Sequence, residues 1–308
     1  MELVYLDYQH LSKIRENLVA TIGQFDGLHQ AHMFLIYQTI ELAKDKKLKS
    51  AVITFDPHPD YVVKKDLSPT YITPIQEKIE YLKKTSLDYM IIINFGNHVM
   101  NMSPVDFIEN ILIANSVKET VVGYDFSFGK DGIGKAEDIS SLSNGKIVNH
   151  IIEEKSYQGK KIGTSLVKWL LAEGKMEEVK FLLGRYYQIE GEVVKGKQIG
   201  RTIHVPTANL KVKPYFAIIK KGVYIVKVKI GDNEYLGIAN LGNNPSFNYQ
   251  ENMVFETHII DFSGDLYGKT LKIELVKYLR PEIKFDSKEK FVEQIKQDIY
   301  IAKNYQFD

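Results

Sequence analysis

The chain contains no cysteine among its 308 residues. Disulfide bonds, thiolate nucleophiles and cysteine-based zinc sites are therefore excluded, and the composition suits a reducing compartment. An excess of one charge is also missing, because 40 basic side chains stand against 39 acidic ones and leave a formal net charge of +1. We therefore expect neither a nucleic acid nor an anionic membrane as a partner.

Long hydrophobic runs are absent as well. The most apolar stretch, residues 90–93, is far shorter than the about 18 residues that a membrane span needs. The first residues, MELVYLDYQHL, lack the basic segment and the apolar stretch of a signal peptide. We expect a soluble protein of the cytoplasm.

The length and the ordinary hydrophobic content of 44% fit two globular domains. In the first part of the chain, short β-branched segments alternate with longer amphipathic ones, which is typical of βαβ units on a parallel sheet. The expected strands are residues 18–23, 50–55, 89–95 and 120–123, and the expected helices are residues 29–47, 74–84 and 103–114. We predict a doubly wound, Rossmann-like α/β domain over residues 1–184.

Closely spaced strands replace this pattern after Gly184. They are expected at residues 188–194, 222–230, 234–240, 253–260 and 269–278, with a final helix at residues 287–304. Several short antiparallel strands without helices between them favour a small barrel. The second domain, residues 185–308, is therefore predicted to be a small antiparallel β-barrel with a C-terminal helix.

The segment TIGQFDGLHQAH, residues 21–32, carries the first candidate site. A strand ends here, two glycines allow a tight turn, and a helix begins near His29. His29 and His32 are three residues apart, so both project from the first helical turn, where backbone N–H groups and the helix dipole favour an anion such as a triphosphate. The alternative is that one histidine caps the helix and the other packs in the core. A zinc site is disfavoured, because no nearby side chains complete a ligand set.

Two further segments follow neighbouring expected strands. FDPHP, residues 55–59, comes after the second strand, and GYDFSFGKDGIG, residues 123–134, comes after the fourth. Because parallel strands present their carboxyl ends at one edge of a sheet, the three segments predict a single cleft. Phe126 and Phe128 could equally belong to the core.

The segment GKQIGRTIHVPTANL, residues 196–210, carries the second candidate site. Its glycines can turn backbone N–H groups towards phosphate oxygens, and the Thr207 hydroxyl and Asn209 amide offer the hard oxygen ligands that Mg²⁺ prefers. An ordinary loop is the alternative. Glu256, in an otherwise apolar strand, either points to solvent or serves as a general base.

These segments resemble the bacterial bifunctional riboflavin kinase/FMN adenylyltransferase family, also called FAD synthetase, over essentially the whole chain. The first domain shows the family's G-x-F-D-G-x-H-x-G-H, F-x-P-H-P and G-x-D-F-x-F-G motifs in order, and the second shows G-R-x-x-G-x-P-T-A-N-L. The resemblance implies phosphorylation of riboflavin to FMN in the second domain. It also implies adenylylation of FMN to FAD in the first, with ATP as co-substrate and Mg²⁺ as cofactor.

The resemblance also implies roles for individual residues. ATP phosphates are expected at Gly23, Phe25, Asp26, Gly27, His29, His32 and Lys168 in one site and at Gly200, Arg201, Thr207 and Asn209 in the other. Flavin contacts are expected from Asp125, Phe126, Phe128, Arg280 and Glu282. The catalytic residues are expected to be Glu256, His29 and His32, and Thr207 and Asn209 are expected to hold Mg²⁺.

Four positions depart from the family pattern. Ala31 and His204 replace glycines, Gly132 stands where arginine is usual, and Lys168 replaces an arginine that can bind phosphate with two parallel hydrogen bonds. Two alternatives therefore stay open. One is a kinase with a catalytically weakened first domain, and the other is a non-catalytic regulator that responds to flavin or nucleotide. The oligomeric state is left open by the sequence.

Overall fold

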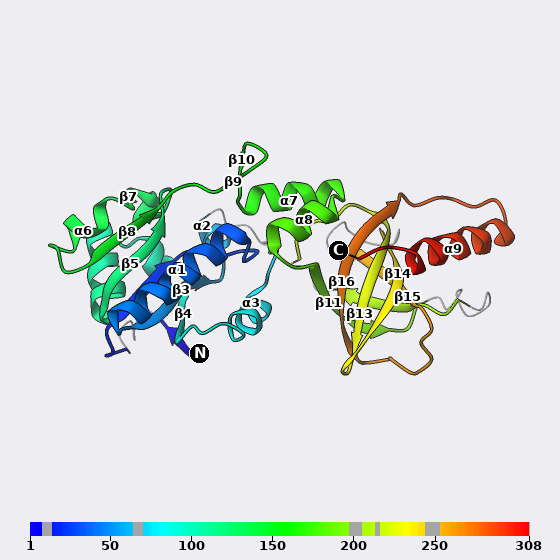
Figure 1. Cartoon of the computed structure of the whole chain (residues 1–308), viewed down its shortest axis with the longest axis horizontal. Coiled ribbons are helices and arrows are strands. Elements are labelled where there is room, and N and C mark those ends of the chain that lie inside the picture. Colours follow the sequence, from blue (N-terminus) through cyan, green and yellow to red (C-terminus); the bar gives the residue numbers. More distant parts are fainter. Residues whose placement is uncertain (8–13, 64–69, 197–204, 213–215, 244–252, 308) are drawn as a thin grey trace. The chain divides into compact units, whose positions relative to one another are not determined.

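A computed structural model describes residues 1–7, 14–63, 70–196, 205–212, 216–243 and 253–307 of the chain. The chain forms two compact units, Met1–Thr164 and Ser165–Asp308 (Figure 1). The boundary between the two compact units, after Thr164, lies at the start of helix α7 (Thr164–Glu173), which helix α8 (Met176–Leu183) follows. The boundary expected from the sequence pattern, after residue 184, lies beyond both helices. The functional boundary after residue 184 stays a prediction.

A parallel sheet of six strands forms the centre of the first unit, in the order β1-β4-β3-β2-β5-β8. The strands are β1 (Glu2–Leu6), β2 (Leu18–Ile22), β3 (Lys49–Asp56), β4 (Tyr89–Asn94), β5 (Val117–Gly123) and β8 (Val148–Ile152). The predicted doubly wound sheet is confirmed. The two edge strands, β1 and β8, were not among the expected strands.

Helices and short turns connect these strands. The helices are α1 (Gln30–Lys46), α2 (Pro59–Val63), α3 (Ile75–Leu82), α4 (Asn97–Met100), α5 (Pro104–Phe107) and α6 (Asp138–Leu142). The expected helix at residues 103–114 begins with a Ser103–Asp106 capping box and continues from α5 as a π-helical turn, Ile108–Leu112, and a 3₁₀ turn. Two small hairpins, β6 (Ser127–Phe128) with β7 (Gly134–Lys135) and β9 (Ser156–Tyr157) with β10 (Lys160–Lys161), complete the unit.

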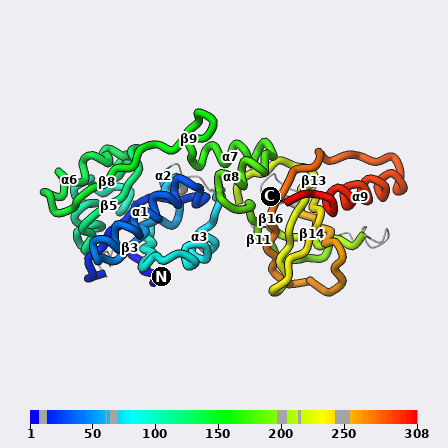
Figure 2. Tube along the Cα trace, viewed as in Figure 1, coloured from blue at the N-terminus to red at the C-terminus, as the bar shows by residue number. Residues whose placement is uncertain are grey.

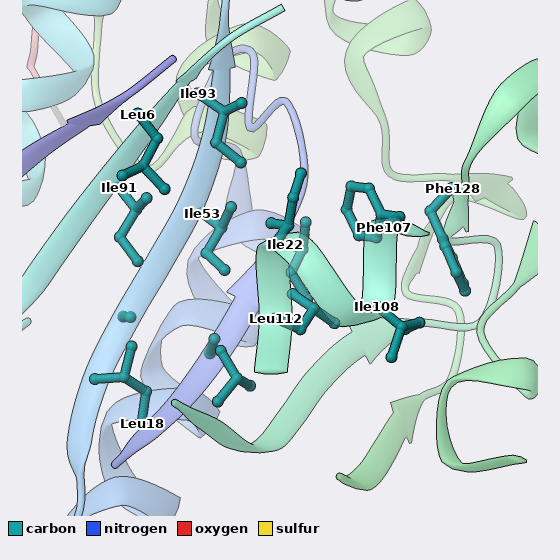
Figure 3. Close-up of a cluster of buried hydrophobic side chains, with 14 of the residues drawn as sticks. Leu6, Leu18, Ile22, Ile53, Ile91, Ile93, Phe107, Ile108, Leu112 and Phe128 are labelled. Atoms are coloured by element: carbon teal, nitrogen blue, oxygen red, sulfur yellow. The ribbon is translucent and has the colours of Figure 1, made fainter. Parts of the chain in front are cut away.

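Both faces of the sheet are buried, as the apolar run in β4 illustrates. Ile91 and Ile93 pack on one side with Ile108 and Leu112 (Figure 3). Met90 and Ile92, which alternate with these residues along β4, pack on the other side of the sheet with residues of α1 and α3. Successive strand side chains point to opposite faces, so a nearly continuous apolar run is what a sheet covered by helices requires.

The second unit is a closed antiparallel barrel in the order β11-β12-β15-β14-β13-β16, as predicted. Its strands are β11 (Tyr187–Val194), β12 (Ala208–Val212), β13 (Gly222–Ile230), β14 (Asn233–Asn243), β15 (Met253–Ile259) and β16 (Thr270–Arg280). The β12 segment was expected to belong to a loop. After β16, the chain ends in α9 (Lys288–Lys303), which lies against β14 (Figure 2). Ile295, Ile299 and Ala302 of this helix pack against the barrel residues Ile225 and Ile238. No helix among the described residues is long and apolar enough to cross a membrane.

Candidate active sites

The loop between β2 and α1 contains most of the predicted residues of the first site. Gly23 follows β2, and Phe25 adopts a positive φ of 51°. Asp26 is 1% exposed, and its Oδ1 accepts hydrogen bonds from the backbone N–H groups of Ile72 and Thr73 at 2.9 and 3.0 Å. These bonds hold the loop against the segment that precedes α3.

Gly27 completes this tight turn with a φ of 92°. A Cβ atom there would lie 3.3 Å from the Ile72 side chain. Glycine adopts this conformation without the strain that other residues meet, and its lack of a side chain lets the loop approach Ile72.

His29 and His32 meet at the start of α1. His29 is the N-cap, and its Nδ1 accepts a hydrogen bond from the backbone N–H of His32 at 3.3 Å. The two rings stack with their centroids 3.6 Å apart, and the Phe25 ring stands edge-on to His32 at 5.3 Å. The spacing therefore predicted correctly that both imidazoles share one face, and the alternative that a histidine caps the helix is also correct.

Several buried polar atoms gather around this loop. Within the described residues, Thr21 Oγ1, Gln24 Oε1 and His32 Nδ1 have no hydrogen-bond partner. Buried polar groups are normally paired, so such a group of atoms is typical of a site that a polar ligand completes. Burial lowers the pKa of His32 well below 6.5, and the nearby His29 and Lys78 lower it further. His32 is therefore a neutral imidazole at pH 7.

The other two segments also follow the carboxyl ends of their strands. Asp56 ends β3, and burial raises its pKa although Lys78 acts in the opposite direction. Asp125 follows β5, is half exposed, and forms an ion pair with Lys161 of the β9-β10 hairpin. Thr164 Oγ1 donates a hydrogen bond to the Asp26 carbonyl at 3.2 Å, which brings the segment after that hairpin to the first loop.

The remaining predicted residues of the first site differ in their burial and in the element that carries them. Phe128 is 4% exposed and packs in the core with its ring 5.3 Å from Phe107, whereas Phe126 is partly buried and stacks on Phe128 at 5.6 Å. Gly132 lies in a 3₁₀ turn between β6 and β7. Lys168 lies on α7, within the second unit. The binding roles of these residues stay predictions.

In the barrel, strand register brings three polar residues into one row. Asn209 of β12 pairs with Glu256 of β15, which in turn pairs with Asn240 of β14. Directly paired residues on adjacent strands have side chains on the same face of a sheet. The Asn209 side chain also lies against Gly196, where a Cβ atom would come within 2.4 Å of it, so a larger residue there would displace the Asn209 amide.

The first of two cavities adjoins this row, and Thr207 lines both cavities. The first, of about 160 Å³, is lined by Glu256, Asn240, Arg280, Glu282 and apolar side chains that include Val223, Ile238 and Phe285. The second, of about 540 Å³, is lined by Pro206, Phe262, Asp265, Leu266 and Tyr267 among others. Thr207, the residue before β12, thus borders both cavities.

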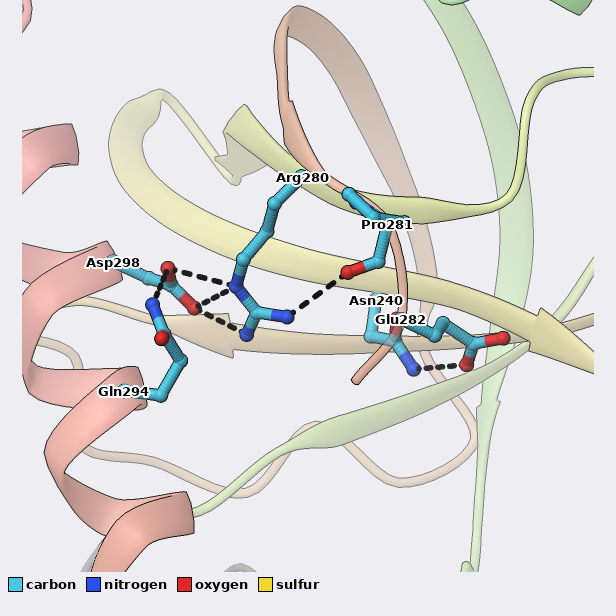
Figure 4. Close-up of polar contacts among 6 residues, drawn as sticks. All are labelled: Asn240, Arg280, Pro281, Glu282, Gln294 and Asp298. Carbon is cyan, nitrogen blue, oxygen red and sulfur yellow. Dashed lines mark hydrogen bonds and ion pairs between the residues drawn. The ribbon is translucent and has the colours of Figure 1, made fainter. Parts of the chain in front are cut away.

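A polar network forms one wall of the smaller cavity (Figure 4). The guanidinium of Arg280 donates to both carboxylate oxygens of Asp298, with distances of 2.7 to 3.2 Å, and Asp298 also accepts from Gln294 at 3.0 Å. Glu282 accepts a hydrogen bond from Asn240 at 3.0 Å. Asp298 is only 2% exposed, so Arg280 joins β16 to α9 through a buried ion pair.

Thr207 and Asn209 carry neutral side-chain oxygens, and Mg²⁺ binds oxygen ligands together with substrate phosphates. Their role as Mg²⁺ ligands stays a prediction. No group of three or more His, Cys, Asp or Glu residues able to hold a metal occurs among the described residues. Gly200, Arg201 and His204 lie outside the described residues, so their roles stay predictions.

Comparisons with known proteins cover both units. The family model for FAD synthetase matches residues 11–166, and the family model for riboflavin kinase matches residues 183–306. A bifunctional riboflavin kinase/FMN adenylyltransferase from Listeria monocytogenes is 35% identical over 92% of this chain and 90% of its own length. The chain belongs to this bifunctional family. Relatives of the same name from Bacillus subtilis and Escherichia coli K12 are 33% and 31% identical over 99% and 94% of the chain, and over 98% and 93% of their own lengths.

A solved structure has the same fold as this family member. The crystal structure of a protein from Streptococcus pneumoniae, described as a macrolide-efflux protein, matches 99% of both chains with a TM-score of 0.90 and 28% identity.

Sequence reasoning missed two charged residues near the predicted sites. Lys78 follows Ile75 by three residues and precedes Leu82 by four, so it falls on the apolar face of α3. A charged residue on the apolar face of an expected helix could have identified Lys78 from the sequence. Asp298 likewise lies three residues after Ile295 in α9.

Proposed function

We propose that this family member carries out two consecutive reactions of flavin cofactor synthesis. Riboflavin and ATP give FMN and ADP in residues 185–308, and FMN and ATP then give FAD and pyrophosphate in residues 1–184. The observation that carries this proposal is the row of Asn209, Glu256 and Asn240, because Glu256 and Asn240 line the smaller cavity together with Thr207. The two family models and the names of the relatives support both activities.

In the kinase reaction, the flavin occupies the smaller cavity and the nucleotide the larger one. The 5′-hydroxyl oxygen of the ribityl chain forms a bond to the γ-phosphorus, the bond from that phosphorus to the bridging oxygen of ADP breaks, and Glu256 accepts the hydroxyl proton. Glu256 suits this role because it lines the cavity assigned to the flavin. Arg280 and Glu282 border the same cavity, as expected of flavin contacts.

Mg²⁺, when bound, neutralises charge on the phosphates during transfer, and Thr207 and Asn209 would hold it.

In the adenylyltransferase reaction, a phosphate oxygen of FMN attacks the α-phosphorus of ATP and pyrophosphate leaves. This step needs no covalent enzyme intermediate. His29, His32 and the N-terminus of α1 stabilise the negative charge that grows on the departing pyrophosphate. Asp125 and Phe126 belong to the loop that we assign to the flavin.

A chromatographic time course with riboflavin and Mg-ATP tests the proposal. FMN should appear first and FAD should follow as FMN accumulates. FMN without FAD would favour the kinase with a weakened first domain, and neither product would favour the regulator. We propose the cytoplasm as the location, because the cysteine-free composition suits its reducing conditions.

A further inference from the structure

Lys78 is a buried cation behind the first site. It lies on α3, is 1% exposed, and donates a hydrogen bond from Nζ to the backbone carbonyl of Gln24. Thr54 Oγ1 of β3 donates to the same carbonyl at 3.1 Å. The two bonds fix this carbonyl between α3 and β3, at the start of the loop that leads to Asp26.

The ammonium group is incompletely paired. Its one hydrogen-bond acceptor among the described residues is the neutral Gln24 carbonyl, although an ammonium has three N–H donors. Asp26 in the loop after β2 and Asp56 at the end of β3 face it and favour its charge, but burial outweighs them and lowers the pKa of Lys78 from 10.5 to about 8. A buried charge of this kind is costly for folding, so its presence calls for another reason.

A third titratable neighbour of Lys78 is His32 at the start of α1. Lys78 contributes to the low pKa of this imidazole, together with burial and His29. At pH 7 the histidine is neutral while Lys78 keeps most of its charge. The cation at this helix start is therefore a lysine, and the stacked imidazoles act as neutral hydrogen-bonding groups.

We propose that Lys78 is a positioning residue of the adenylyltransferase site, an inference that rests on the proposed function. Its ammonium anchors the Gln24 carbonyl away from the phosphates and supplies the positive charge that balances the triphosphate behind the loop. It acts through the loop and through His32 and does not touch the reacting atoms. FAD formation should consequently depend on the protonation of this lysine.

The test compares the full-length wild type with Lys78→Arg and Lys78→Met from pH 6 to 9.5. FAD formation from FMN and Mg-ATP is measured beside FMN formation from riboflavin, which serves as an internal control of the second unit, and the thermal unfolding of each variant reports the folding of the first unit. Lys83→Met removes an exposed lysine at the end of the same helix and is the matched control.

We expect the wild-type kcat/KM for FAD formation to fall above about pH 8, since this ratio reports the free protein, in which the lysine then loses its proton. Lys78→Arg should retain activity and lose this fall, because arginine stays charged. Lys78→Met should lower kcat about 10-fold or more at pH 7 and show no alkaline fall. FMN formation and the Lys83→Met variant should be unchanged.

The inference is overturned if wild-type FAD formation does not fall at alkaline pH, or if the same fall persists in Lys78→Arg. It is also overturned if Lys78→Met keeps the wild-type kcat and pH profile. A wild type that makes FMN but no FAD at any pH would instead refute the proposed adenylyltransferase function, and this inference with it. The wild-type pH profile keeps the inference testable even if Lys78→Met fails to fold.

Discussion

Replacing Lys78 by methionine should stabilise the first unit at pH 7, although it removes a residue that we propose supports activity. Methionine has a similar length and helix propensity and carries no charge to bury. In the folded chain the amine is 1% exposed and has a pKa of about 8. An unfolded lysine keeps a pKa near 10.5, so the folded state binds a proton less tightly than the unfolded state.

The magnitude follows from this difference in pKa. The pKa of Lys78 falls from 10.5 to about 8, and each pH unit corresponds to about 1.4 kcal/mol, so the cost of keeping Lys78 charged in the folded chain is roughly 3 kcal/mol. Losing the hydrogen bond to the Gln24 carbonyl offsets about 1 kcal/mol, because Thr54 still satisfies that oxygen. The net gain is therefore about 2 kcal/mol, which corresponds to roughly 4–8 °C in the Tm of a unit of this size.

The gain should also depend on pH. Below pH 8 the folded lysine is charged and the full cost is present. Between about pH 8 and 10.5 the folded lysine is neutral while the unfolded one still binds a proton, so wild-type stability rises with pH. The advantage of methionine should fall towards zero by about pH 9.5.

Calorimetry at pH 7 and 9.5 measures these differences, and hydrogen exchange of the β2 and β3 amides assigns the transition to the first unit. A lower Tm for Lys78→Met than for the wild type at pH 7 would show that the buried charge of Lys78 does not destabilise the first unit. A Tm difference that does not shrink between pH 7 and 9.5 would show the same. Lys83→Met, an exposed neighbour, should leave the Tm nearly unchanged.

The remaining predictions concern one residue each. Glu256→Gln should lower FMN formation about 10²–10⁴-fold while FAD formation from supplied FMN persists, and a normal kinase rate in the coupled assay would exclude Glu256 as the base. His29→Ala should make FMN accumulate without FAD and lower the stability of α1 by about 1 kcal/mol through loss of its cap; continued FAD synthesis at the wild-type rate would contradict its role. Arg280→Met leaves the 2% exposed Asp298 carboxylate without its guanidinium and should lower the free energy of unfolding of the second unit by about 3–5 kcal/mol. Urea unfolding followed by the fluorescence of Trp169 on α7 measures this loss, and an unchanged midpoint would show that the pair contributes little.

The sheet was predictable where side-chain pattern alone determines the structure. The run in β4 is apolar at consecutive positions because both faces are covered, which a sequence shows directly. The edge strand β8, VNHII, leaves Val148 and Ile151 exposed, so it lacks the pattern of a buried strand. Strand β12 was missed because its residues, ANLKV, belong to a motif that reads as a phosphate loop.

The sites were predictable only within short segments. The three-residue spacing of His29 and His32 fixes their common face, because helix geometry alone sets it. The pairing of Asn209 with Glu256 depends on the register of β12 with β15, which joins residues far apart in the sequence and which no local pattern reports. The pairing of Arg280 with Asp298 depends on how α9 packs against the barrel, so it too emerges only from the tertiary structure.

In the proposed function, one chain directs attack at two different phosphorus atoms of ATP, and isotope transfer distinguishes these two attacks. Riboflavin is incubated with ATP labelled at either the γ- or the α-phosphorus, and FAD is isolated. Label from both positions should reach FAD, the γ-label in the phosphate next to the ribityl chain and the α-label in the adenylyl phosphate. FAD that lacks either label, or no labelled flavin at all, would contradict the proposed function.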